Sequence, residues 1–294
     1  MKRRILDRIH DRAWREVGDL LSTRQDILAD PKQDEPASSI SSTMPWATIC
    51  SAFADGEMDS RKFRRTTAVR EIVETVGPVD GCFYAERIRE WGPEYFTFPG
   101  VRKIDAWGDP LRWPGLLLGT PRSFSPTSLR YLATALWLKK SGYLETAAEI
   151  VEIGVGFGGL AAMNALVSQS ITTLVDLPQV ERSAMRMLTE TGLAEYGRLS
   201  RESNESSGKF VISNYAFTEL NSKLQKFYFD RYISKSSHGI IVSNSAVFAS
   251  TIQGRSDEDL VAWFRSEGMA ASLVTTSDLL GPSDRFFGVS LIHW

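Results

Sequence analysis

The stretch Val151–Gly159, with the sequence VEIGVGFGG, is a short apolar run that breaks into glycines just after an acidic residue. A continuous apolar run bounded by glycines predicts a buried parallel strand. The glycines then permit a tight turn and let a ligand approach bare backbone. Apolar residues follow at helical spacing, so the unit is strand, glycine loop and helix. Nucleotide-like ligands dock on such a unit in an open α/β sheet.

The glycine loop matches two patterns. Gly154, Gly156 and Gly159 fit the dinucleotide fingerprint G-x-G-x-x-G, which is a weak signal alone. Gly154, Gly156 and Gly158, with Glu152 before them, fit the acid-x-G-x-G-x-G pattern of S-adenosylmethionine-dependent methyltransferases. A carboxylate at the mouth of the loop would repel a pyrophosphate and attract the cationic amino-acid end of a sulfonium ligand. Electrostatics therefore favours the second pattern.

From residue 149 onward the sequence alternates strands and helices. Strands are predicted at 149–153, 172–176, 197–200, 210–213, 239–243, 271–275 and 287–292. Helices are predicted at 158–167, 179–191, 219–233 and 256–267. Helical crossovers between strands imply a parallel sheet. Because Thr276–Phe286 is too short for a crossover, the last strand is expected to run antiparallel. The predicted fold is a Rossmann-like, class I methyltransferase type α/β sheet. Asp176 ends the second strand, where an acid accepts hydrogen bonds from ribose hydroxyls in either family.

The region before this sheet is predicted to be mainly helical. We divide the chain into an N-terminal region, 1–120, and an S-adenosylmethionine-binding domain, 121–294. Residues 5–30 have the spacing of an amphipathic helix. Arg61–Arg65 is a basic run, interpreted as a solvated helix face or an anion site. The aromatic residues of Trp91–Pro114 either form a satellite core or line a binding cleft.

Composition narrows the class of protein. The 294 residues are 43% hydrophobic and 24% charged with a net charge of −2, which is ordinary for a globular chain and gives no footprint for nucleic acid. Two cysteines make a disulfide framework improbable, so a cytoplasmic location is expected. No apolar run reaches the about 20 residues that a membrane span needs. No His/Cys cluster has metal-ligand spacing, and no metal is predicted.

Three blocks of sequence resemble the sugar O-methyltransferase family, a class I S-adenosylmethionine-dependent family. Ser125–Tyr131 (SPTSLRY) resembles its helix before the core, and Ser125-Pro126 is also a typical helix start. Glu152–Leu160 (EIGVGFGGL) resembles its glycine loop. Val211–Leu220 (VISNYAFTEL) is similar to its segment after the fourth strand. The blocks span about the last 170 residues. One departure is Ser200–Ser207, which is short and polar where the family has a third strand and an adenine-contacting acid.

The resemblance implies S-adenosylmethionine as cofactor and methyl transfer as reaction. It implies the following cofactor-binding residues: Glu152, Gly154, Gly156, Phe157, Gly158, Asp176, Leu177, Ser213, Thr127 and Arg130. The family's label implies a hydroxyl of a sugar or glycosylated small molecule as acceptor. A peptide or carboxylate acceptor in natural-product tailoring is the first alternative, and an NAD-dependent oxidoreductase is a lower one. A binding or scaffold protein that keeps the fold without turnover is a further alternative.

The sheet topology sorts the catalytic candidates, because ligands bind outside the carboxyl ends of parallel strands. Asn214 and Tyr215 directly follow the fourth strand and are predicted to position the acceptor. Glu219 is predicted to act as the base or to orient the acceptor, or else to be a solvated or helix-capping carboxylate. Four polar residues after later strands are candidates for acceptor binding: Asn244, Asp278, Asp284 and Arg285.

The histidines and the N-terminal region complete the predictions. His238 and His293 are expected at the opposite edge of the sheet, and His10 lies in the N-terminal helix. The N-terminal region is expected to supply either the acceptor pocket or a homodimer interface.

Overall fold

The computed structural model describes residue 39 and residues 45–145, 148–202 and 209–294. The predicted helix at 5–30, which includes His10, lies outside the described residues. The strands are β1 Glu149–Ile153, β2 Ile171–Val175, β3 Gly197–Leu199, β4 Phe210–Asn214, β5 His238–Ser243, β6 Ser272–Val274 and β7 Ser290–His293. They form one sheet in the order β3-β2-β1-β4-β5-β7-β6. All neighbouring pairs are parallel except those of β7, which runs antiparallel to both β5 and β6.

The predicted fold class is therefore confirmed, with one refinement. β7 does not close the sheet from outside but inserts between β5 and β6, leaving β6 at the edge. The connection from β6 to β7 holds a short helix, α13 Pro282–Phe286, so β7 begins later than the predicted residue 287. α13 has only five residues, which is too few for the crossover that a parallel strand would need, so the chain returns antiparallel.

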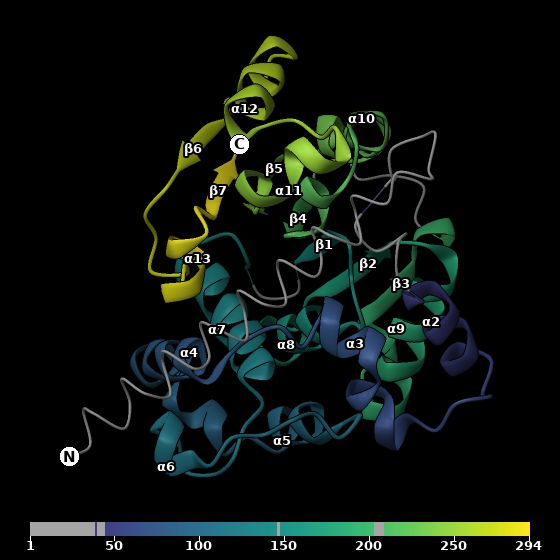
Figure 1. Ribbon diagram of the computed structural model, residues 1–294, viewed down its shortest axis with the longest axis vertical. Coiled ribbons are helices and arrows are strands. Elements are labelled where there is room, and N and C mark those ends of the chain that lie inside the picture. Colours follow the sequence, from purple (N-terminus) through teal and green to yellow (C-terminus); the bar gives the residue numbers. More distant parts are fainter. Residues whose placement is uncertain (1–38, 40–44, 146–147, 203–208) are drawn as a thin grey trace.

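Helices cover both faces of the sheet (Figure 1). Those of the second half are α7 Pro126–Lys140, α8 Gly159–Ser168, α9 Pro178–Thr191, α10 Ser222–Arg231, α11 Ser245–Ile252 and α12 Asp257–Ser266. α11 was not predicted, and the predicted helix at 219–233 begins instead as a 3-10 turn, Ala216–Glu219, before α10. α10 and α12 pack on one face, where their phenylalanines Phe229 and Phe264 meet the β-strand residues Val211 and Ile241.

The N-terminal region packs on the other face. Its helices are α2 Trp46–Ala54, α3 Thr67–Ile72, α4 Pro78–Trp91, α5 Pro99–Ala106 and α6 Gly115–Leu118. α4 lies along α7, and α2 lies along α9. Buried side chains such as Phe53 and Ile88 belong to the same hydrophobic cluster as Ile150 of β1. The described part of this region thus shares its core with the sheet. Most aromatic residues of 91–114 pack against this shared core, and Phe98 is exposed. Trp107, for example, stacks on Phe157 with ring centroids 5.9 Å apart.

The basic run Arg61–Arg65 contains a buried ion pair that the sequence pattern did not reveal. Arg64 is fully buried, and its Nε lies 2.5 Å from Glu74 Oε1. The same guanidinium donates to the hydroxyls of Ser125 and Ser128 at the start of α7. Arg64 therefore ties the N-terminal region to the helix that precedes the sheet, whereas Arg61 is solvent-exposed as predicted for a helix face.

Replacing Arg64 by methionine is expected to lower the free energy of unfolding by about 3–5 kcal/mol, because Glu74 would remain buried without its partner. Arg65→Met is the matched control, since that side chain is 57% exposed and pairs with a half-exposed Asp109. We expect the control to change stability by at most about 1 kcal/mol. Urea unfolding of the two variants measures the difference, and equal effects would contradict a structural role for the buried pair.

Candidate functional site

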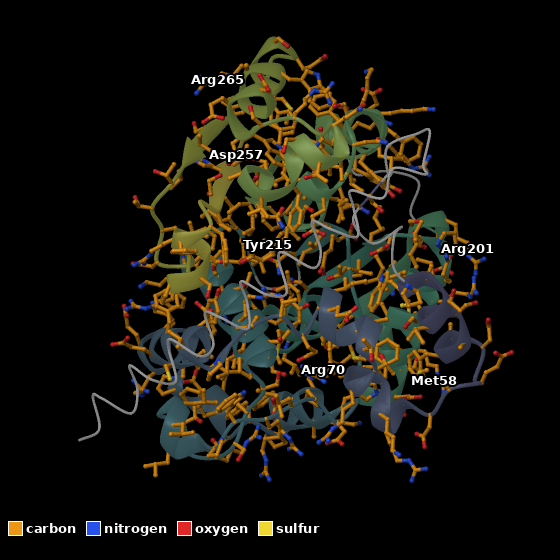
Figure 2. All side chains as sticks on the ribbon, in the orientation of Figure 1. Met58, Arg70, Arg201, Tyr215, Asp257 and Arg265 are labelled. Atoms are coloured by element: carbon orange, nitrogen blue, oxygen red, sulfur yellow. The ribbon has the colours of Figure 1, made fainter. Side chains whose placement is uncertain are left out.

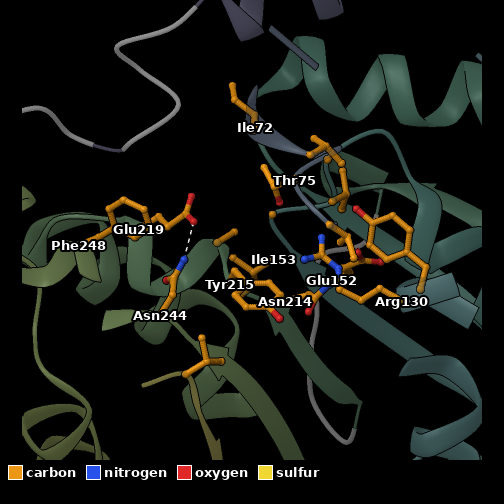
Figure 3. Close-up of a pocket in the computed structure, with 18 of the residues that line it drawn as sticks. Ile72, Thr75, Arg130, Glu152, Ile153, Asn214, Tyr215, Glu219, Asn244 and Phe248 are labelled. Carbon is orange, nitrogen blue, oxygen red and sulfur yellow. Dashed lines mark hydrogen bonds between the residues drawn. The ribbon is translucent and has the colours of Figure 1, made fainter. Parts of the chain in front are cut away.

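A cavity of about 270 Å³ lies at the carboxyl ends of β1, β2, β4 and β5 (Figure 3). Its floor is the glycine loop after β1, and its sides are the residues that follow β2, β4 and β5. The segment after α3, residues 72–76, and the first turns of α4 cover it from the N-terminal region. The cavity therefore lies where the topology places ligand sites in open α/β sheets.

The glycine loop owes its shape to left-handed backbone. Gly154, Gly156 and Gly158 have φ values of 82°, 55° and 87°. A Cβ on Gly154 would lie 1.9 Å from the Cβ of Ala216, so the loop passes directly against the segment after β4. A Cβ on Gly156 would meet nothing nearer than 3.8 Å. Gly154 and Gly156 line the cavity, while Gly158 does not.

Glu152 is the last-but-one residue of β1 and lines the cavity, although its side chain is only 2% exposed. Its Oε2 has no hydrogen-bond partner among the described residues. Burial raises the pKa of Glu152 well above its ordinary value, and the neighbouring Asp176 carboxylate raises it further. A buried carboxylate oxygen without a donor is costly unless a ligand supplies one.

Asp176, directly after β2, is the second acid at the glycine loop. Burial raises its pKa from an ordinary value near 3.8 to about 7, with Glu181 adding to the rise. Backbone N–H groups of Leu177, Gly156 and Val155 donate to it and limit the rise. The glycine loop thus holds the carboxylate in place through its own amides, and the side chain also lines the cavity.

A second polar group lies across the cavity, after β4 and β5. Asn244 Nδ2 donates to Glu219 Oε1 at 2.7 Å, the contact marked in Figure 3. Thr218 Oγ1 donates to Asn244 Oδ1 at 2.8 Å, which fixes the orientation of the amide. Asn214, Glu219 and Asn244 all line the cavity, so the structure brings these three predicted residues together.

Tyr215 lies at the centre of the molecule (Figure 2) and has a φ of 74°, which is rare for a residue other than glycine. Its hydroxyl donates to Asp284 Oδ1 at 2.8 Å, and Tyr84 of α4 donates to the other oxygen at 2.9 Å. The Arg130 guanidinium lies 5.0 Å from the Tyr215 ring centroid, and its Nε has no partner among the described residues. Ser283 donates to Asp80 of α4 through its N–H at 2.9 Å. The hairpin between β6 and β7 is therefore joined to α4 across the cavity.

Several predicted residues do not line the cavity. Ser213 is buried because its hydroxyl bridges Ile153 O of β1 and Phe217 N. Thr127 is buried inside α7, and Phe157 is buried against Trp107 and Tyr131 beneath the loop. Four further predicted residues also lie outside the cavity lining: Gly158, Leu177, Asp278 and Arg285. Of these, Asp278 and Arg285 are exposed on the outer side of the hairpin.

The histidines lie where the topology predicted. His238 starts β5 at the amino edge, and His293 ends β7 opposite Ile240 of β5 and Ser272 of β6. Neither lines the cavity. Sequence reasoning missed Asp80, Tyr84 and Tyr228, which do. Asp80 and Tyr84 share one face of α4, but their spacing gave no indication that this face would pack against the connection between β6 and β7.

The described residues contain neither a candidate metal cluster nor a helix that could span a membrane. No group of three or more His, Cys, Asp or Glu side chains among them is arranged to hold a metal ion. No helix in the described part of the chain combines the length and apolar character required to cross a membrane.

No protein-family profile and no curated protein sequence matches the chain. Solved structures give weak similarities. A protein of Galdieria sulphuraria assigned as a sarcosine dimethylglycine methyltransferase has 14% identity and a TM-score of 0.41, covering 55% of this chain and 82% of its own. The geranyl diphosphate C-methyltransferase of Streptomyces coelicolor has 12% identity and a TM-score of 0.40, covering 55% and 77%. TrmK of M. capricolum has 16% identity and a TM-score of 0.37, covering 55% and 66%. Identities and TM-scores this low support no conclusion about the function of this chain.

Proposed function

We propose that the cavity binds S-adenosylmethionine and that the protein transfers its methyl group to an acceptor hydroxyl. The observation that carries the proposal is Glu152, a buried carboxylate beside the glycine loop with an oxygen that lacks a donor. The cofactor's ammonium group supplies that donor. Asp176 accepts hydrogen bonds from the ribose hydroxyls, and the open side of Gly156 leaves room for the ligand.

The charges of the cavity favour a cationic cofactor over a dinucleotide. Five carboxylates line it, and they belong to Asp80, Glu152, Asp176, Glu219 and Asp284. Arg130 is the one lysine or arginine among the described lining residues. A pyrophosphate would add two negative charges beside Glu152 and Asp176. Burial already raises the pKa of both carboxyl groups, and the Asp176 carboxylate raises that of Glu152 further, so more negative charge is unfavourable there. A sulfonium with an ammonium group brings positive charge instead. Arg130 then binds the carboxylate of the methionyl group.

Methyl transfer needs alignment of the acceptor more than covalent chemistry by the protein. The bound cofactor supplies an electrophilic methyl group and a thioether leaving group. Glu219, held by Asn244 at 2.7 Å, takes the proton of the acceptor hydroxyl as the oxygen forms its bond to carbon. Asn214 and Tyr215, which line the same cavity, position the acceptor. The segment at residues 72–76 and α4 cover the reacting groups and exclude water.

We further propose a sugar or a glycosylated small molecule as acceptor. The support is the polar lining after β4 and β5, where hydroxyl groups find carboxylate and amide partners in Glu219 and Asn244. A peptide or carboxylate acceptor is the alternative. Mass spectrometry of the product after mild base distinguishes them, since methyl esters hydrolyse and methyl ethers do not.

The decisive experiment is calorimetric titration with S-adenosylhomocysteine, with NAD as the control ligand. Micromolar binding of S-adenosylhomocysteine alone is expected. Binding of NAD in preference would overturn the proposal in favour of an oxidoreductase. Transfer from a radiolabelled methyl donor to candidate sugars then tests turnover, and binding without turnover on any acceptor would favour a scaffold role.

The affinity for S-adenosylhomocysteine is expected to rise as pH increases through about 7, because Asp176 and Glu152 both have raised pKa values and both are ionised in the proposed complex. Asp176 has a pKa of about 7 in the ligand-free protein and must be ionised to accept the ribose hydroxyls. Binding therefore releases a proton from each of these carboxyl groups that is protonated in the free protein, and affinity falls by up to about tenfold per group for each unit of acidification. Titrations at several pH values measure the profile. Asp176→Asn should bind weakly with a flatter profile, and an unchanged profile would contradict the assignment.

A further inference from the structure

The segment Leu111–Leu117 exposes apolar side chains, and none of its residues lines the cavity. Seven large hydrophobic residues are exposed in the described part of the chain, and three of them belong to this segment. Leu116 is 92% exposed, Leu111 is 58% exposed and Leu117 is 37% exposed. Scattered apolar residues are normal on a surface, whereas a cluster of this kind marks an interaction site.

The leucines are held outward by a rigid loop. Trp113 N donates to Phe124 O at 2.8 Å and Phe124 N donates back at 3.2 Å, which closes the loop at its base. Thr120 N donates to Gly115 O at 2.9 Å. Leu118 is 1% exposed and anchors the loop beneath α4. The loop therefore has a fixed geometry in which one leucine of α6 faces the core and the two before it face solvent.

Three exposed arginines, Arg89, Arg102 and Arg112, lie near the loop that carries the leucines. Arg122 at the base of the loop is paired with Asp105 Oδ2 at 3.2 Å. Arg89 donates to Gly119 O at 2.9 Å, at the end of α6. Arg102 and Arg112 lie close enough to Arg122 for their charges to lower its pKa, in addition to the larger effect of burial. The apolar tip thus has a basic rim, with Trp113 at its base.

We propose that this loop binds the surface of an anionic phospholipid membrane, with Leu116 and Leu117 inserted between the headgroups. An apolar tip on a basic rim suits that surface, because acyl chains accept the leucines while phosphates pair with the arginines. A tryptophan at the base matches the level of the headgroups. α6 forms one edge of the molecule in Figure 1, and none of its residues lines the cavity. Membrane binding would therefore leave the cavity open.

Co-sedimentation of the full chain with vesicles tests the proposal. We expect binding to vesicles of equimolar phosphatidylcholine and phosphatidylglycerol, weaker binding to phosphatidylcholine alone, and loss of binding at high salt. Leu116→Asp should weaken binding by about tenfold or more without changing the melting temperature, because the side chain makes little contact with the protein. Arg112→Glu should weaken binding to anionic vesicles only. Phe227→Asp is the matched control, since that ring is 53% exposed on α10 at the other end of the molecule.

Three outcomes would overturn the proposal. The first is failure of the wild-type chain to bind anionic vesicles, and the second is equal binding by Leu116→Asp. The third is a dimer in sedimentation that Leu116→Asp dissociates while vesicle binding is absent, because the loop would then contact a second copy of this chain. None of these outcomes depends on cofactor binding or methyl transfer.

Discussion

Replacing Glu152 by glutamine is expected to weaken binding of S-adenosylhomocysteine by about 100-fold. The reason is that the ligand's ammonium group would lose a buried, charge-assisted partner, and such losses cost about 2–5 kcal/mol. The same substitution is expected to stabilise the ligand-free protein at neutral pH. Burial raises the pKa of Glu152 above its value in the unfolded chain. The unfolded chain therefore releases this proton at lower pH than the folded protein, and stability falls as pH rises from the unfolded pKa towards the folded one. Calorimetry and thermal unfolding measure the two effects.

The opposite signs make this prediction specific. A residue that only supports the fold would lose stability and binding together when replaced. Glu149→Gln is the control, because Glu149 begins the same strand but its side chain is 57% exposed and pairs with Lys209. The control should change neither binding nor stability appreciably. If Glu152→Gln bound the ligand as tightly as the wild type, the ammonium assignment would be wrong.

Replacing Gly154 by alanine is expected to lower the free energy of unfolding by about 2–4 kcal/mol. Two costs add up in this estimate. The left-handed φ of 82° is strained for any residue with a Cβ. The new methyl would also lie 1.9 Å from Ala216 Cβ, so the glycine loop or the segment after β4 must move. Chemical unfolding measures the loss, and calorimetry should show that ligand binding disappears with it.

Gly142→Ala separates the two costs. Gly142 also has a left-handed φ, of 77°, but a Cβ there would meet nothing within 4 Å. It should lose only the conformational part, about 1–2 kcal/mol. If the two variants lost the same free energy of unfolding, the close approach of Ala216 would contribute nothing to the cost of the Gly154 substitution.

Much of the sheet could be predicted because its signals are local. Each of the seven strands was expected near its observed position, and the antiparallel direction of β7 followed from the shortness of the segment before it. The spacing of residues along the sequence was enough to single out the glycine loop, Glu152 and Asp176 as candidate cofactor-binding residues. α11 was missed because its eight residues follow β5 directly, without a loop to separate the two elements.

The cavity walls were harder to predict because residues far apart in the chain form them. Asp284 meets Tyr84 only because the β6–β7 hairpin lies over α4, some 200 positions away in sequence. Ser213 and Asn214 are consecutive residues of β4, but side chains alternate along a strand, so Ser213 bonds to β1 while Asn214 lines the cavity. Similarly, the run Arg61–Arg65 resembled a solvated face, and only packing buried Arg64 among hydroxyl and carboxylate partners.

Local chemistry thus determines the order of the elements and the glycine loop at which we propose that the ligand binds, because glycine conformations and apolar periodicity depend only on neighbouring residues. Tertiary packing decides which carboxylates are buried, and burial sets their charge. Glu152 and Asp176 are ordinary acids in the unfolded chain. The folded sheet buries both in one cavity, and burial raises the pKa of each, with the Asp176 carboxylate adding to the rise for Glu152. This buried pair is the reason that we propose a cationic ligand.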